Sequence, residues 1–133
     1  LSVLEISKAK YPMTLWAPVT KPFPYSVLYF TDEFDDKGKM MRAEIARLGK
    51  DYDVNLFSID NYFDRIETSI QIHQGTNDDA VPVEWSDEFV DSMEEMEKEI
   101  EYFVYPGADH NMAGSWGKVV ERDVNFFKEK LID

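Results

Sequence analysis

Two short apolar segments separated by one amphipathic helix limit the fold most strongly. Ser69–Gln74 and Ile100–Tyr105 have the length of buried strands, and Trp85–Lys98 between them has apolar residues at helical spacing. Strands that alternate with helices pair in parallel, because a crossover returns the chain to the same end of the sheet. The sequence therefore predicts an α/β fold, with a mostly parallel sheet and flanking helices.

The remaining elements extend this order on both sides. Apolar spacing predicts a closing helix whose inward stripe consists of Trp116, Val120, Val124, Phe127 and Leu131. No capping residue precedes the first helix, so we expect a processed or truncated chain. Tyr25–Phe30 fits a strand or a helical turn equally well. The other predicted elements are a helix tail at Leu1–Lys8, a strand at Met13–Val19, a helix at Lys39–Lys50, a short strand or extended connector at Val54–Ile59, and the closing helix at Trp116–Leu131.

One carboxylate and one imidazole follow the two best-defined strands. Asp78 comes just after the first strand, past Gly75, and His110 lies on the loop after the second strand. The carboxyl ends of parallel strands meet at one edge, so we expect the two side chains to come together. An Asp that accepts the Nδ1–H of a His fixes its tautomer and prepares it as a general base. Asp79, the neighbour of Asp78, is expected to point the other way.

No serine in the sequence fits the nucleophile position. A nucleophile elbow, Gly-x-Ser-x-Gly on a sharp turn after a strand, does not occur. Ala113–Gly117 has a similar spacing around Ser115, but no apolar strand leads into it. We therefore expect Ser115 to be an N-cap of the last helix, and Ser86 to have the same role in the preceding helix.

The sequence predicts no cofactor and no metal site. Cysteine is absent, and His73, the second histidine, falls inside a strand, where we expect a structural role. Glu33–Glu44 has the spacing of a calcium-binding loop, but Lys37 occupies a position that requires an oxygen ligand.

The charge balance excludes two classes of partner. Lys and Arg number 14 against 27 Asp and Glu, a formal net charge of −13. Nucleic acids and anionic membranes attract cationic surfaces, so neither is an expected partner. No apolar run approaches the roughly 20 residues that cross a bilayer. Without Cys or a signal-peptide pattern, the compartment stays open and the cytoplasm is slightly favoured.

Two longer motifs carry a resemblance to a known family. H-Q-G-T-N-D-D-A-V-P-V-E-W-S and E-Y-F-V-Y-P-G-A-D-H resemble the C-terminal part of the α/β-hydrolase domain of the prolyl oligopeptidase family. Leu15–Val19 is similar to the strand that follows the nucleophile helix there, and Leu1–Lys8 to the end of that helix. The resemblance implies that Asp78 is the acid and His110 the general base of a serine triad.

The resemblance also implies how the chain is organised. Residues 1–133 would be the C-terminal part of one domain, and its nucleophile-bearing N-terminal part would be the missing partner. Residues 20–62 would be an insert or lid. In one interpretation, the aromatic side chains in and next to this insert line an apolar substrate site. In the other, they pack the insert on the sheet. These residues are Phe23, Tyr25, Tyr29, Phe30, Phe34, Tyr62 and Phe63.

The expected function is hydrolysis of peptide or ester bonds through an acyl-enzyme, and this chain alone should be inactive. One alternative is a carboxylesterase or acyl-hydrolase of the same fold, which the Asp–His pair does not distinguish from a peptidase. The other is a non-catalytic module that binds a partner. The three predicted strands would leave an apolar edge of the sheet open, and a homo-oligomer formed by exchange is a further way to cover it.

Overall fold

The three predicted strands form one sheet, and all of its pairs are parallel. The computed structural model describes residues 1–131. The strands are β1 (Met13–Trp16), β2 (Ile70–Gly75) and β3 (Ile100–Tyr105), in the order β1-β2-β3. The predicted α/β fold is therefore confirmed, with β1 ending at Trp16 instead of Val19.

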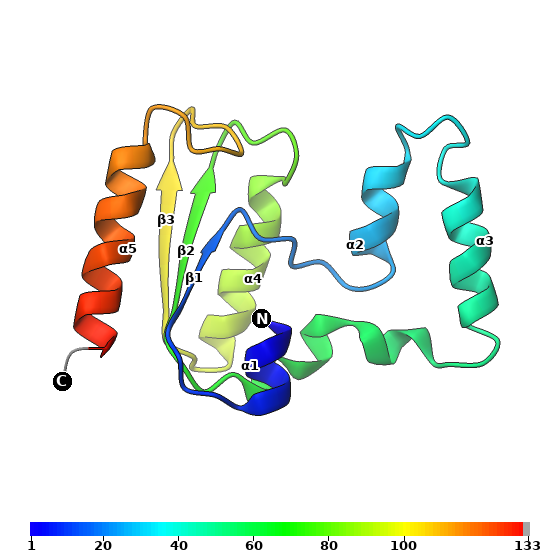
Figure 1. Cartoon of the computed structure of the whole chain (residues 1–133), viewed down its shortest axis with the longest axis horizontal. Helices are drawn as coiled ribbons and strands as arrows, with labels where there is room; N and C mark the ends of the chain where they lie inside the picture. Colours follow the sequence, from blue (N-terminus) through cyan, green and yellow to red (C-terminus); the bar gives the residue numbers. More distant parts are fainter. Residues whose placement is uncertain (132–133) are drawn as a thin grey trace. The chain divides into compact units, whose positions relative to one another are not determined.

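Two helices cover the two faces of this sheet (Figure 1). α4 (Val83–Glu95) lies on one face and α5 (Trp116–Leu131) on the other. Side chains of a strand alternate between faces, so β2 serves both helices. Gln74 bonds to Ser86 of α4, whereas His73 bonds to Asp123 of α5. Every residue of β2 is buried, which makes this strand the centre of the core.

The predicted inward face of α5 is wrong. Val119, Asp123 and Phe126 are its buried residues, whereas Trp116 and Leu131 of the predicted stripe are 49% and 60% exposed. The reason is polar. Asp123 accepts hydrogen bonds from the side chains of β1 and β2, and these bonds set the rotation of the helix. A stripe chosen by hydrophobicity alone cannot include an aspartate.

A small apolar cluster lies beneath the carboxyl ends of the strands. Tyr105 ends β3, and the other members come from the loops and helices around it. The packing of this cluster holds in place the two loops that follow β2 and β3. Its buried members are Ala17, Val81, Trp85, Tyr105, Ala108, Met112 and Val119.

The chain divides into two compact units. One combines Leu1–Val19 with Asp64–Asp133 and contains the sheet, α1 (Ser2–Ser7), α4 and α5; the other is Thr20–Phe63. The predicted helix tail at Leu1–Lys8 corresponds to α1. The lid role of residues 20–62 stays a prediction.

The second unit is helical. Its elements are α2 (Tyr25–Leu28), η1 (Tyr29–Thr31), α3 (Lys39–Leu48), η2 (Val54–Phe57) and the start of η3 (Ile59–Arg65). Tyr25–Phe30, left open by the sequence, is helical. The predicted strand or extended connector at Val54–Ile59 is wrong, because the Asp53 carboxylate accepts the Asn55 N–H at 3.1 Å and starts a 3₁₀ turn.

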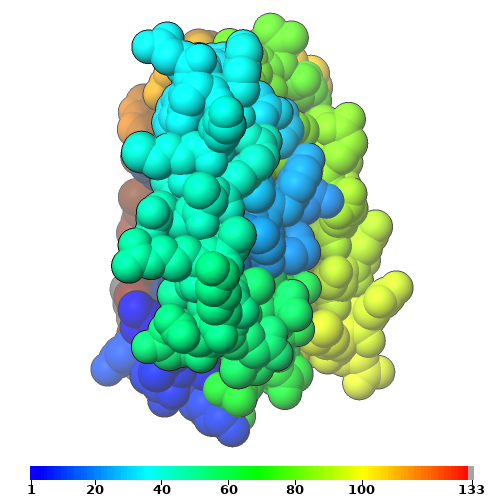
Figure 2. Space-filling model, turned by 90° about the vertical axis from the view of Figure 1, so that its right-hand side faces the viewer, coloured from blue at the N-terminus to red at the C-terminus, as the bar shows by residue number. Residues whose placement is uncertain are grey.

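Within this unit α2 and α3 border an apolar groove of about 440 Å³. Met41, Ile45 and Leu48 of α3 lie along it, and none of them is fully buried. Figure 2 shows α3 and the segment after it, coloured cyan to green. Aromatic rings of the unit also contact one another, for example Phe23 and Phe57 at 6.0 Å between centroids.

Among residues 1–131, no helix has the length and apolar character needed to cross a membrane.

Candidate active site

Asp78 lies on the loop that leaves β2, and its carboxylate is held from several sides. The backbone N–H groups of Ala80 and Val81 donate to Oδ1 at 2.9 and 2.8 Å. On the other oxygen, Oδ2, the Gln74 amide donates at 3.2 Å and His110 Nδ1 lies at 2.9 Å. The side chain of Asp78 has no exposed surface. Such a carboxylate has a fixed direction and acts as a rigid acceptor.

His110 lies on the loop that leaves β3. The side chain of Asp109 accepts the N–H groups of Asn111 and Ala113, both at 3.0 Å, and so folds this loop. The ring of His110 is 43% exposed, and its Nδ1 faces Asp78. Its Nε2 has no hydrogen-bond partner within residues 1–131. Because the ring is partly exposed, this nitrogen is available to a group outside the described part of the chain.

The two loops meet because of one glycine. A Cβ on Gly75 would lie 2.3 Å from the carbonyl oxygen of Ala108 and 2.7 Å from that of Asp109. Only a residue without a side chain allows this approach. The loops are then tied by two bonds, from Asn77 N–H to the Ala108 carbonyl at 2.9 Å and from Gly107 N–H to the Thr76 hydroxyl at 2.8 Å.

The surroundings of Asp78 keep it charged. Burial acts to raise the pKa of its carboxyl group, but hydrogen bonds from Val81, His110 and Ala80 together outweigh burial and lower the pKa below 3.8. The carboxylate is thus an acceptor at neutral pH, and Nδ1 of His110 carries the proton between them. This is the arrangement in which the free Nε2 of a histidine acts as a base.

Asp79 is exposed, as predicted.

His73, the second histidine, is fully buried in β2. Its Nε2 lies 2.8 Å from the Gln71 side-chain oxygen and 3.0 Å from Asp123 Oδ1, both acceptors, so Nε2 carries the proton. Nδ1, 2.7 Å from the Tyr105 hydroxyl, then accepts from it. Both nitrogens are used inside the core, in agreement with the structural role that the sequence predicts.

This burial predicts a pH dependence of stability. Burial lowers the pKa of His73 below its ordinary 6.5, and the opposing effect of Asp123 is smaller. Between the folded pKa and about 6.5, His73 is therefore protonated in the unfolded chain but not in the folded chain. The free energy of unfolding should fall as pH decreases from 6.5 towards the folded pKa, by up to about 1.4 kcal/mol per pH unit. Urea unfolding at about pH 7.5 and 5.5 measures this loss. A His73→Gln variant should lose less free energy of unfolding than the wild type over this pH range. An equal loss in the two proteins would show that His73 is not the cause.

The structure gives Ser115 no nucleophile geometry. It lies directly before α5, and its carbonyl oxygen accepts the N–H groups of Lys118 and Val119 in the first turn of the helix. No strand leads into it within the described residues. The predicted N-cap role of Ser86 is wrong. The residue is fully buried, and its hydroxyl donates to Gln74 at 2.7 Å instead of capping α4.

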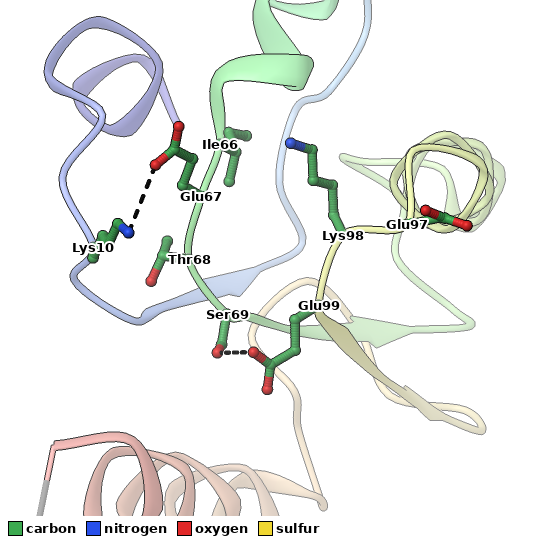
Figure 3. A pocket seen from close by; sticks show the side chains of 8 residues that line it. All are labelled: Lys10, Ile66, Glu67, Thr68, Ser69, Glu97, Lys98 and Glu99. Atoms are coloured by element: carbon green, nitrogen blue, oxygen red, sulfur yellow. Dashed lines mark hydrogen bonds and ion pairs between the residues drawn. The ribbon is translucent and has the colours of Figure 1, made fainter.

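A polar hollow of about 400 Å³ lies at the opposite end of the sheet, where β2 and β3 begin (Figure 3). Lys10 and Glu67 form an ion pair across it at 3.9 Å, and the Ser69 hydroxyl donates to Glu99 at 2.6 Å. Functional groups of open α/β sheets gather at the carboxyl ends of the strands, and this hollow is at the amino ends. Its lining residues are Lys10, Ile66, Glu67, Thr68, Ser69, Glu97, Lys98 and Glu99.

Comparison with known proteins identifies the family. The sequence model of the prolyl oligopeptidase family matches residues 20–133, which include both Asp78 and His110. The chain belongs to the prolyl oligopeptidase family. The resemblance stated from the sequence is thereby confirmed. A search of curated proteins found no match.

Solved structures agree on the fold of this family member. A puromycin-hydrolyzing peptidase of Mycobacterium tuberculosis has a TM-score of 0.67 at 19% identity, over 91% of this chain and 18% of its own. A Bacteroides ovatus protein named for dipeptidyl aminopeptidase IV has a TM-score of 0.65 at 18% identity, over 96% of this chain and 17% of its own. Est1E from Butyrivibrio proteoclasticus has a TM-score of 0.50 at 23% identity, over 65% of this chain and 32% of its own.

These similarities confirm the α/β-hydrolase fold. They also show that the chain spans less than a fifth of the length of the two peptidase-named structures.

Proposed function

We propose that this chain is the C-terminal part of a serine hydrolase that cleaves peptide bonds through an acyl-enzyme. Asp78 is the orienting acid and His110 the general base in this proposal. The observation that carries it is the 2.9 Å contact between Asp78 Oδ2 and His110 Nδ1, with Nε2 of the ring left free at an exposed edge. Membership of the prolyl oligopeptidase family supports the reaction class.

The proposed reaction uses His110 twice. As a serine hydroxyl attacks the carbonyl carbon, Nε2 of His110 takes its proton, and Asp78 stabilises the imidazolium through Nδ1–H. The imidazolium then gives that proton to the departing amine or alcohol. The acyl group stays on the serine, and this is the acyl-enzyme. A water molecule attacks the acyl group, its proton passes to Nε2, and the serine recovers the proton when the acid product departs.

The serine and the oxyanion-hole donors lie outside these 133 residues in this proposal. The sequence contains no Gly-x-Ser-x-Gly, and neither Ser115 nor Ser86 has the geometry of a nucleophile. The missing part would also cover β1, an edge strand of the sheet that includes Trp16 at 43% exposure. The nucleophile-bearing N-terminal part is thus the proposed partner of this chain, in preference to a second copy exchanged between molecules.

A carboxylesterase uses the same pair of residues, so the substrate must be tested directly. We expect the complete protein to hydrolyse peptide anilides faster, in kcat/KM, than p-nitrophenyl esters of simple acids. A preference for the esters would assign the chain to the esterase alternative. Hydrolysis of neither, with the fold intact by circular dichroism, would favour the non-catalytic module.

A further inference from the structure

Gln74 lies beneath Asp78 and has no exposed surface. It belongs to the face of β2 that packs on α4, and its amide nitrogen reaches three oxygens at 3.2 Å: the carbonyls of Gly75 and Val81 and the carboxylate Oδ2 of Asp78. Its amide oxygen accepts the Ser86 hydroxyl at 2.7 Å. Each end of the side-chain amide is therefore occupied by partners of the matching kind.

The direction of this amide is determined by chemistry. The two carbonyls and the ionised Asp78 carboxylate can only accept hydrogen bonds, so the end that faces them must be the NH₂ group. Turning the amide over would place its oxygen against three other oxygens and would leave the Ser86 hydroxyl facing an NH₂ group. Ser86 is also fully buried, so no solvent would compensate for that loss.

The bond to Asp78 falls on the oxygen that also contacts His110. Oδ1 is anchored by the backbone of Ala80 and Val81, whereas the partners of Oδ2 are the side chains of Gln74 and His110. Without the Gln74 donor the carboxylate can rotate about its Cβ–Cγ bond, and Oδ2 leaves the line to the imidazole. A weaker or misdirected Asp–His bond gives a less well oriented base.

We propose that Gln74 and Ser86 are positioning residues for this site: Ser86 fixes the Gln74 amide, and Gln74 fixes the Asp78 carboxylate against His110. This inference rests on the proposed hydrolase function. Neither residue touches substrate or the reacting atoms, so both act through Asp78.

The test uses the complete protein with Gln74→Met, Ser86→Ala and the double variant. Gln74→Met should lower kcat about 10- to 100-fold, the size seen when the outer hydrogen-bond partner of a metal-ligating residue is removed. KM should stay within about twofold, because the substrate contacts are unchanged. Ser86→Ala should have a smaller effect in the same direction. Ser92→Ala is the matched control, since Ser92 lies in the same helix and, among the described residues, its hydroxyl bonds only to the Glu88 carbonyl.

Two readouts separate positioning from a general loss of packing. Ser86→Ala should have no further effect on kcat in the Gln74→Met background, because Ser86 acts only through the amide. The acid limb of the pH profile of kcat/KM should move to lower pH in Gln74→Met, since the misdirected Asp78 carboxylate stabilises the charged imidazole less. Wild-type kcat and an unmoved acid limb in Gln74→Met, or additive effects in the double variant, would overturn the proposal.

A magnetic resonance measurement separates this proposal from the function on which it rests. The Nδ1 proton of His110, bonded to Asp78, should give a downfield signal in the complete wild-type protein that broadens or disappears in Gln74→Met and stays in Ser92→Ala. If no hydrolysis is found but this signal behaves as stated, the hydrolase function fails and the positioning of Asp78 stands. If the signal is unchanged in Gln74→Met, the positioning proposal fails.

Discussion

Asp78→Asn in the complete protein should lower kcat about 10⁴-fold while the protein stays folded. The amide keeps an oxygen for the Ala80 and Val81 N–H groups but presents NH₂ where Oδ2 now faces His110. The imidazole must then accept at Nδ1 and carry its proton on Nε2, the nitrogen that should receive the serine proton. The base is in the wrong tautomer, and the attack stalls. Steady-state kinetics on a chromogenic peptide measure the loss.

The chain provides a matched control at the next residue. Asp79→Asn makes the same chemical change at an exposed side chain that is outside the pair, and its kcat should stay within about twofold of the wild type. His110→Ala should resemble Asp78→Asn in its loss, because the proposed function has the two residues act as one unit. Equal kinetics for Asp78→Asn and Asp79→Asn would show that Asp78 has no special part in the reaction.

Gly75→Ala should lower the free energy of unfolding by about 3 kcal/mol, at the upper end of the cost of overpacking. The added methyl would meet backbone oxygens, at 2.3 Å on Ala108, and backbone cannot turn aside as a flexible side chain can. The loops after β2 and β3 must separate, and the Asp78–His110 contact separates with them. Urea denaturation measures the stability, and kcat should fall in the residual folded protein.

Gly117→Ala is the matched control for this substitution. Gly117 lies in α5, and no atom of residues 1–131 outside its local surroundings is within 4 Å of a Cβ built on it. Alanine there should be neutral or should stabilise the protein by up to about 1 kcal/mol, as expected for glycine replaced inside a helix. If Gly75→Ala were as stable as Gly117→Ala, the close approach of the two loops would not be a constraint of the fold.

The sequence was sufficient to predict the sheet and the meeting of Asp78 with His110, because both follow from periodicity and from strand order. β2 and β3 are short apolar segments joined through a helix, which leaves parallel pairing as the simple solution. Once they are parallel neighbours, the loops after them lie at one edge. The contact of Asp78 with His110 is a consequence of that topology.

Polar side chains in the core could not be predicted in the same way. The rotation of α5 depends on Asp123, which a hydrophobic stripe assigns to solvent, and Ser86 looks like an ordinary residue of a helix start. Gln74 had one usable signal, since alternation along β2 places it on the same inward face as Ile70 and Ile72. A polar residue at an inward position needs a partner, but the sequence does not say which one.

The most direct test of the account is intact mass and peptide mapping of the complete protein after treatment with a fluorophosphonate. We predict one probe per molecule, on a serine outside residues 1–133, with labelling slowed strongly in His110→Ala and unchanged in Asp79→Asn. Labelling of Ser115 or Ser86, or no labelling of a folded wild-type protein, would contradict the claim that Asp78 and His110 serve a serine supplied from elsewhere in the protein.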